Sequence, residues 1–209
     1  MSNWPKVRLG DVCEEIRDRI PSSKVSVERY ITTDNMVKNR GGIVKADYVP
    51  EDTGLVNYKK GDVLIANIRP YLKKIWLADN EGGCSSDIIV LRASRQGLWN
   101  EYLYSVLSQD AFFDYVMQKP RGTKMPRGDR EWMKQFLFLL PPLPVQRSIV
   151  ARLPASAMSR RNGRVRCAAT SRVPARNRRR SRAPCADASR ASVRRWRGSR
   201  STSRCIPGA

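Results

Sequence analysis

Residues 119–130, with the sequence KPRGTKMPRGDR, have the composition of an anion-binding loop. They include five basic residues against one acid, together with two glycines and two prolines. Gly122 and Gly128 allow the backbone to flex and to approach a ligand closely. Lysine and arginine neutralise phosphates, and arginine can also bind the edge of guanine with two hydrogen bonds. The segment therefore indicates nucleic-acid binding, and an ordinary solvated loop is the alternative that composition leaves open.

A second basic cluster surrounds an aromatic residue earlier in the chain. Arg69, Lys73 and Lys74 flank Tyr71 in the sequence RPYLKK. These cations could neutralise phosphates in the same way. The alternative is the solvated end of a strand, which composition does not exclude.

Residues for catalysis are scarce. The sequence holds no histidine, so neither a Ser–His nor a Cys–His pair can form. It contains no G-x-x-x-x-G-K-[ST] phosphate loop and no glycine-rich strand-to-helix loop of the dinucleotide type. The acids Glu14-Glu15 and Glu51-Asp52 are adjacent in sequence, which points their side chains apart in a helix or strand. We predict no catalytic residues and no cofactor, and therefore a binding protein.

Metal binding and membrane insertion are not indicated either. The cysteines are odd in number, form no C-x-x-C and have no histidine to join them, which argues against a tetrahedral zinc site. The N-terminus MSNWPKVRLGD lacks an apolar signal segment, and no apolar run approaches the roughly 20 residues of a membrane helix. We expect a soluble, cytoplasmic protein without a bound metal.

The positive charge is unevenly distributed along the chain. The net charge is +21 over 209 residues. Residues 154–209 hold 16 arginines, no lysine and one acid, which gives +15, whereas residues 1–153 carry the remaining +6. A basic surplus favours anionic partners, nucleic acid first. The C-terminal part is poor in large apolar residues, so we expect it to be a disordered tail.

Residues 1–153 alternate between short apolar runs and glycine or proline turns, and then change to a helical period. The segment 4–12 suggests a short strand that leads into a turn or short helix, and Asn100 could cap a helix that runs to residue 118. A short helix is expected at residues 130–134. Further strands are expected at residues 30–36 (at their start), 43–49, 63–66, 74–78, 87–91 and 136–140. These elements predict an α+β fold with a curved mixed β-sheet and packed helices.

A proline cluster separates the last expected strand from a helix start. Residues 141–144 read PPLP, and apolar residues then recur at helical spacing from Val145 to Leu153. After Leu153 this pattern stops. We therefore divide the chain into a folded domain at 1–144, the start of a helix at 145–153 and the tail at 154–209.

The segments VRLGDV, YITTDNM, GDVLIANIRPY, CSSDIIVLR, GTKMPRG and LPPLPVQRSIVARL follow one another along the chain. Together they resemble the target-recognition domain of the specificity (S) subunits of type I restriction–modification systems. The resemblance extends from Val7 to Leu153. It ends in a PPLPxQ segment in which Val145 stands where the family usually has glutamate.

The resemblance implies a specific function. S subunits recognise a bipartite DNA sequence with two such domains, each reading one half-site, and they have no catalytic residues. Long helices join the two domains and dock the modification (methyltransferase) subunits, and restriction subunits complete the assembly. The implied partners are double-stranded DNA and these subunits. The candidate DNA contacts are, first, Arg121, Thr123, Lys124 and Arg127 and, second, Arg69, Lys73 and Lys74.

The segment after Leu153 departs from the family, in which a long amphipathic helix should follow. Arginine, alanine, serine and proline without lysine are what an out-of-frame reading of a GC-rich gene produces, so we expect residues 154–209 to be a frameshift product. Loss of that spacer helix would impair docking of the modification subunits. A selected basic arm is the alternative for this segment. Two other functions stay open: non-specific nucleic-acid binding driven by the tail, and a stand-alone metal-dependent endonuclease.

Overall fold

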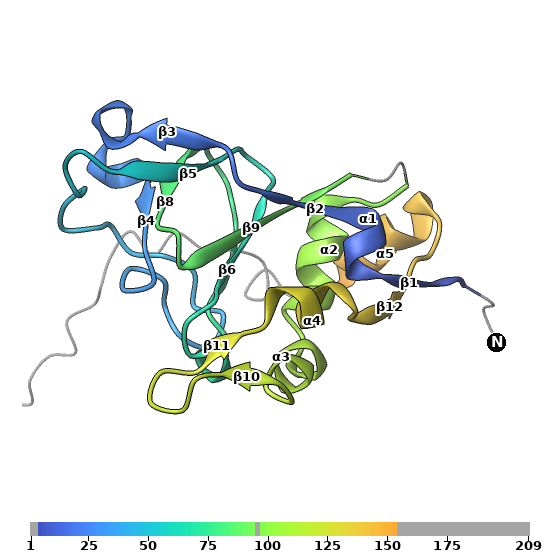
Figure 1. Cartoon of the computed structure of the whole chain (residues 1–209). Coiled ribbons are helices and arrows are strands. Elements are labelled where there is room, and N and C mark those ends of the chain that lie inside the picture. Colours follow the sequence, from blue (N-terminus) through green and yellow to red (C-terminus); the bar gives the residue numbers. More distant parts are fainter. Residues whose placement is uncertain (1–3, 95–96, 154–209) are drawn as a thin grey trace, which may run out of the picture. The chain divides into compact units, whose positions relative to one another are not determined.

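Two four-stranded sheets form the centre of the protein in a computed structural model that describes residues 4–94 and 97–153 (Figure 1). The predicted tail at 154–209 lies outside the described residues. The first sheet is antiparallel, and its strands in spatial order are β2 (Cys13–Ile16), β9 (Ile88–Ala93), β6 (Val63–Ala66) and β7 (Ile75–Leu77). The second sheet is mixed because β4 pairs with β8 in parallel. Its order is β3 (Arg19–Pro21), β5 (Gly54–Tyr58), β8 (Gly82–Cys84) and β4 (Tyr30–Ile31).

The first sheet is buried on both faces, which explains why β6 and residues 88–91 of β9 are continuous apolar runs. Val63 and Ile65 of β6 point into a core shared with the helices, whereas Leu64 and Ala66 point into a core against the second sheet. A buried cysteine lies in each core, Cys13 on the helix side and Cys84 on the sheet side. The first sheet therefore lies between a layer of helices on one face and the second sheet on the other.

The helices that cover the first sheet come from the C-terminal half of the described chain, together with one short helix near the N-terminus. Buried side chains of α2 and α3, among them Leu103, Phe112 and Phe113, fill the core on that side. The helices are α1 (Leu9–Val12), α2 (Asn100–Leu107), α3 (Asp110–Val116), α4 (Arg130–Lys134) and α5 (Leu143–Arg152). Three 3₁₀ turns, η1 (Ser22–Lys24), η2 (Val27–Arg29) and η3 (Pro70–Leu72), lie in the connections.

Two small antiparallel sheets complete the fold. Strand β1 (Lys6–Arg8) pairs with β12 (Leu137–Leu139), so the beginning and the end of the described chain lie side by side. Strand β10 (Pro120–Arg121) pairs with β11 (Arg127–Gly128) in a hairpin. The basic segment 119–130, predicted as a loop, is thus largely a β-hairpin.

The predicted α+β class, with mixed β-structure and packed helices, is confirmed; in the described residues the strands divide among four sheets. Residues 43–49 form no strand; only an isolated bridge joins Ile43 to Met36. The helix expected from 100 to 118 is interrupted at Gln109, whose extended backbone (φ −74°, ψ 154°) ends one helix and precedes the next. Asn100 does not cap it: Trp99 holds the N-cap position, and the Asn100 side chain accepts a hydrogen bond from Ala93 N–H.

The last helix begins at Leu143, two residues before the predicted start at Val145. Pro144 fits there because the first turn of a helix leaves its N–H groups without intrahelical partners. Among the helices of residues 4–94 and 97–153, none has the length and apolar character to span a bilayer.

Candidate nucleic-acid interface

The hairpin β10–β11 presents a short exposed loop. Arg121 faces Arg127 across the two strands, and residues 122–126 form the turn between them. Gly122 adopts a positive φ of 83°, a conformation that suits glycine. The side chains of Thr123, Lys124 and Met125 are exposed at this turn.

Backbone hydrogen bonds join this hairpin to the second predicted basic cluster. Gly128 N–H donates to the carbonyl of Asn67 (3.1 Å), and Arg69 N–H donates to the carbonyl of Pro126 (2.8 Å). An isolated antiparallel bridge between Ile68 and Arg127 lies between these bonds. The two basic clusters, about 50 residues apart in sequence, therefore form one surface, which we call the hairpin surface: residues 119–130 and 67–74.

The cations of the hairpin fall into paired and unpaired groups. Arg121 forms an ion pair with Asp129 (2.8 Å), and Arg127 forms one with Asp87 (3.2 Å). Lys124 has no carboxylate partner among the described residues, and its side chain extends into solvent. Arg130, the last cation of the segment, instead turns inward to Glu15 and to the carbonyl of Ser86.

The second cluster is divided in the same way. The Arg69 side chain is exposed, and its backbone has a positive φ of 52°. Lys73 Nζ lies 2.6 Å from Asp110. Lys74 Nζ donates to the carbonyl of Thr33 (2.6 Å), and burial lowers the pKa of this ammonium group. Lys74 is therefore less available to a phosphate than Arg69 is.

Arg40 belongs to this surface, and sequence reasoning missed it. Its N–H donates to the carbonyl of Lys73 (2.9 Å), and its guanidinium pairs with Asp110 and bonds to the carbonyl of Ser108. Hydrogen bonds from Lys73 and Arg40 lower the pKa of Asp110 to about 2. No sequence motif connects residue 40 with residues 73 and 110, so only the fold reveals the cluster.

Asp129 connects the hairpin to helix α4. Its side chain caps the helix by accepting hydrogen bonds from the N–H groups of Glu131 and Trp132, and it also binds Arg121. Its pKa lies below the ordinary value, chiefly because Arg121 donates a hydrogen bond to the carboxylate. The carboxylate is therefore ionised at neutral pH.

Aromatic and apolar side chains accompany these cations. Tyr71 and Met125 are each about half exposed, at 48% and 47%, on the two loops that the backbone bonds hold together. Lys119 Nζ lies 3.9 Å from the centre of the Trp132 ring, a cation–π contact. Cations combined with exposed apolar groups are suited to a nucleic acid, which offers both phosphates and bases.

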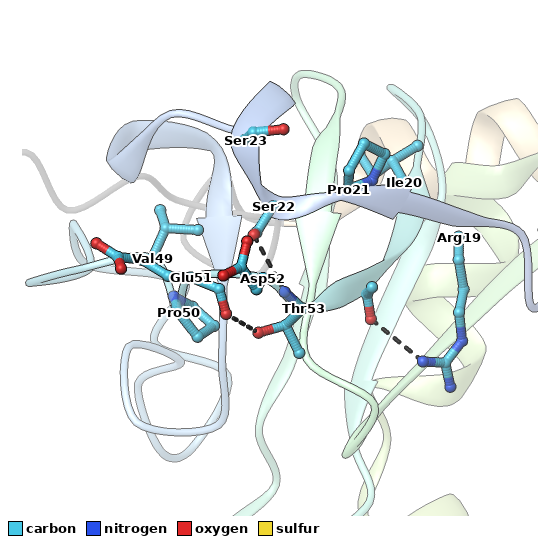
Figure 2. A pocket seen from close by; sticks show the side chains of 11 residues that line it. Arg19, Ile20, Pro21, Ser22, Ser23, Val49, Pro50, Glu51, Asp52 and Thr53 are labelled. Carbon is cyan, nitrogen blue, oxygen red and sulfur yellow. Dashed lines mark hydrogen bonds between the residues drawn. The ribbon is translucent and has the colours of Figure 1, made fainter.

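A hollow of about 630 Å³ lies beside β3, at the other end of the described residues from the hairpin (Figures 1 and 2). Figure 2 shows that its polar side chains bond to nearby backbone: Thr53 Oγ1 donates to the carbonyl of Glu51, and Arg19 donates to that of Gly54. These contacts stabilise the turn before β5. They do not converge on a common point where a ligand would bind.

Of the acidic pairs noted in the sequence, Glu15 is held by two arginines. Glu15 bonds to Arg17 and Arg130. Burial alone would raise the pKa of Glu15, but these two arginines outweigh it and the pKa lies below the ordinary value. Within residues 4–94 and 97–153, no three acids or cysteines gather in a way that could hold a metal ion.

Comparison with known protein families assigns a chain with this fold and this basic surface to the DNA specificity domains of restriction systems. Residues 1–156 match the family described as the type I restriction modification DNA specificity domain, and the chain belongs to that family. The resemblance noted in the sequence is confirmed, and the chain is classed with a specificity component rather than with an enzyme.

Individual relatives agree with this assignment. The type I restriction enzyme EcoDI specificity subunit of Escherichia coli is 27% identical over 156 residues, which are 73% of this chain and 34% of that protein. The crystal structure of the HsdS subunit from Thermoanaerobacter tengcongensis matches 71% of this chain and 40% of its own, with 31% identity and a TM-score of 0.56. An S subunit from M. genitalium shares the fold at 15% identity with a TM-score of 0.50. The chain thus spans about a third of the curated relative.

Proposed function

We propose that this chain binds duplex DNA with sequence preference through the hairpin surface and reads one half-site of a bipartite target. The observation that carries the proposal is the pair of backbone bonds, Gly128–Asn67 and Arg69–Pro126, which unite two basic clusters on one surface. A two-stranded β-ribbon fits the major groove, where each base pair has a distinct pattern of donors and acceptors. Family membership supports the same function.

The roles of the side chains follow from their exposure and pairing. Lys124 and Arg69 have exposed cations and would bind phosphates, with Thr123 as a further donor. Arg121 and Arg127 are held by carboxylates and would contact base edges. Lys73 and Lys74 contribute positive potential, although both already have partners within the protein.

Selection from a pool of randomised duplexes with the full chain tests the proposal. We expect one short sequence to be enriched, and replacement of Arg121, Lys124 and Arg127 by glutamine to abolish the preference. Replacement of Arg19, Lys24 and Lys45 by glutamine removes the same charge from residues outside the hairpin surface, and should leave the preference intact. Equal affinity for every duplex at all ionic strengths would refute the proposal.

Non-specific binding through residues 154–209 is the competing function, and the +15 charge of that segment favours it. A variant that lacks residues 154–209 separates the two. If the tail dominates, its removal weakens binding to all duplexes equally and flattens the dependence on salt. If the hairpin surface reads DNA, a preference survives the deletion even though the affinity falls.

We further propose that the chain acts without catalysis in the cytoplasm, as a specificity component whose intact relatives work with modification and restriction subunits. We propose that the segment after Leu153 is a frameshift product, so that docking of those subunits is impaired and the protein is monomeric or assembles poorly. Translation of the coding DNA in the other frames from codon 153 should then yield a leucine- and glutamate-rich helix. Co-purification of a stable complex with modification subunits would contradict the impaired docking.

A further inference from the structure

The two oxygens of the Asp129 carboxylate bind different groups, one the start of a helix and the other an arginine. Oδ1 accepts hydrogen bonds from the N–H groups of Glu131 (3.0 Å) and Trp132 (3.3 Å) at the start of α4. Oδ2 accepts from Nε of Arg121 (2.8 Å) and lies 2.8 Å from Nη2 of the same guanidinium. The helix start therefore fixes the carboxylate, and the carboxylate fixes the arginine.

We propose that Asp129 is a positioning residue that directs Arg121 toward a guanine in the major groove, an inference that rests on the proposed function. A guanidinium has five N–H donors in a planar fork. Asp129 binds the side formed by Nε and Nη2, so the outer side formed by Nη1 and Nη2 stays available. Two parallel donors on that side match the O6 and N7 acceptors of guanine.

The support behind Asp129 is rigid. Trp132 stacks on Tyr115 with the ring centres 4.6 Å apart and an interplanar angle of 9°, and Trp132 Nε1 donates to the carbonyl of Tyr115 (3.0 Å). Met133 of the same helix is buried in the core. Core packing therefore fixes the orientation of α4. Because Asp129 is bound to the start of α4 and Arg121 is bound to Asp129, the same packing determines where Arg121 lies.

An incidental surface ion pair would not produce the same behaviour. The Arg121 side chain is 71% exposed, and ion pairs that exposed contribute little to stability. If the pair only neutralised charge, its loss would affect all DNA sequences alike. A positioning role instead predicts an effect on discrimination between sequences that depends on Arg121.

The experiment uses Asp129→Asn in the full chain, because asparagine caps a helix about as well as aspartate. Affinities are measured for the duplex enriched by the wild type and for the same duplex with each G·C pair replaced in turn. We expect the preference at one G·C pair to fall about five-fold or more, since Arg–guanine contacts carry discrimination of that order. Binding to unrelated duplexes should strengthen, with a salt slope steeper by about 0.9 as the released arginine takes a phosphate.

Two comparisons isolate the cause. In an Arg121→Gln background, Asp129→Asn should cause no further loss of discrimination, because the two residues act as one unit. Glu28→Gln removes an equal charge from the exposed pair with Lys45 and should leave discrimination at that base pair unchanged. Arg121→Lys keeps the charge but loses the planar fork, and should lose the preference while the salt slope stays the same.

The outcomes separate the two claims. A wild-type chain without any preferred duplex overturns the proposed function and this inference with it. A wild-type chain that discriminates, together with an Asp129→Asn variant of unchanged discrimination, overturns the positioning role alone. An equal loss from Asp129→Asn with and without Arg121 also overturns it. If Asp129→Asn fails to fold, Arg121→Lys provides the test instead. An Arg121→Lys variant that keeps the preference at that G·C pair would overturn the positioning role.

Discussion

Gln146 stabilises the junction between the last strand and α5 from a fully buried position. Its Oε1 accepts a hydrogen bond from Trp99 N–H (3.0 Å), and its Nε2 donates to the carbonyls of Pro141 (2.7 Å) and Gly97. This glutamine is the one in the PPLPxQ segment of the sequence. One side chain therefore satisfies three backbone groups from two segments that precede helices α2 and α5.

Replacement of Gln146 by alanine should lower the free energy of unfolding by about 2–4 kcal/mol, because it leaves buried polar groups unpaired. Urea unfolding followed by circular dichroism measures the change. Arg147→Ala, on the exposed side of the same helix turn, is the matched control and should change stability by no more than about 0.5 kcal/mol. A Gln146→Ala variant as stable as that control would show that the three hydrogen bonds contribute little.

Lys124→Gln should weaken DNA binding equally for preferred and unrelated duplexes, because an exposed ammonium group at the turn meets phosphates rather than bases. The magnitude of the slope of log affinity against log salt should fall by about 0.9, the value for one phosphate contact. Fluorescence anisotropy over a salt series measures it. A change in sequence preference would instead identify Lys124 as a base contact.

For single residues, the sequence indicates which basic side chains belong to the surface but not which of them form ion pairs. Basic residues near Gly122 and near Tyr71 are visible in the sequence, and both groups do lie on one surface. Their carboxylate partners Asp87 and Asp110 are distant in sequence, so no local pattern predicts them. Pairing of this kind depends on tertiary structure alone.

The hairpin β10–β11 depends on close packing at Gly128. A Cβ at this position would overlap Cε of Met133 and lie 3.0 Å from both Oδ1 of Asn67 and Cγ1 of Val116. Oδ1 of Asn67 is also a buried acceptor for which the described residues offer no donor. The hairpin therefore rests on the domain at a point where a methyl group would require Met133 to move and Asn67 and Val116 to give way.

Gly128→Ala should destabilise the protein by about 1–3 kcal/mol through overpacking, and should reduce DNA affinity as the hairpin moves away from Asn67. Thermal unfolding and DNA binding are measured together. Gly54→Ala is the control, because its Cβ would meet only the Arg19 side chain at an ordinary 3.4 Å. If Gly128→Ala lost stability but kept full DNA affinity, the position of the hairpin would not matter for binding.

Strands with a distinctive local composition could be predicted from the sequence, whereas strands that depend on contacts with distant segments could not. Strand β6 and residues 88–91 of β9 are runs of apolar residues buried on both faces, so composition is sufficient to identify these strands. Strand β8 begins with Gly82 and Gly83, which suggest a turn. A Cβ at Gly82 would overlap the carbonyl of Arg29, so glycine is required there by the close approach of a segment from a distant part of the chain.

Over the whole described domain, ion pairs determine how stability depends on pH. The pKa of Asp110 is about 2, below its ordinary value of 3.8, because Lys73 and Arg40 bind its ionised form. A carboxyl group with a lowered pKa stabilises the folded state above its ordinary pKa, and this contribution disappears as the pH falls toward 2. The sequence contains no histidine whose titration would add a step near neutral pH.

The melting temperature of the wild type should therefore be nearly constant from pH 5 to 8. Asp110→Asn should melt at a lower temperature than the wild type in that range, and the two proteins should converge as the pH falls from about 4 to about 2. Asp114→Asn, which removes an exposed carboxylate of the same helix that has no ion pair in the described residues, is the control. A constant difference between Asp110→Asn and the wild type down to pH 2 would exclude the ion pairs as its cause.

The buried thiols make the two cores separately observable. Burial raises the pKa of both Cys13 and Cys84 to about 12, so the reactive thiolate is scarce in the folded protein. A maleimide dye should label Cys13 only when the layer between helices and sheet opens, and Cys84 only when the two sheets separate. Peptide mapping at successive times would compare the labelling rates of Cys13 and Cys84. The faster rate identifies the core that opens more often, and the wild-type sequence is sufficient for the experiment.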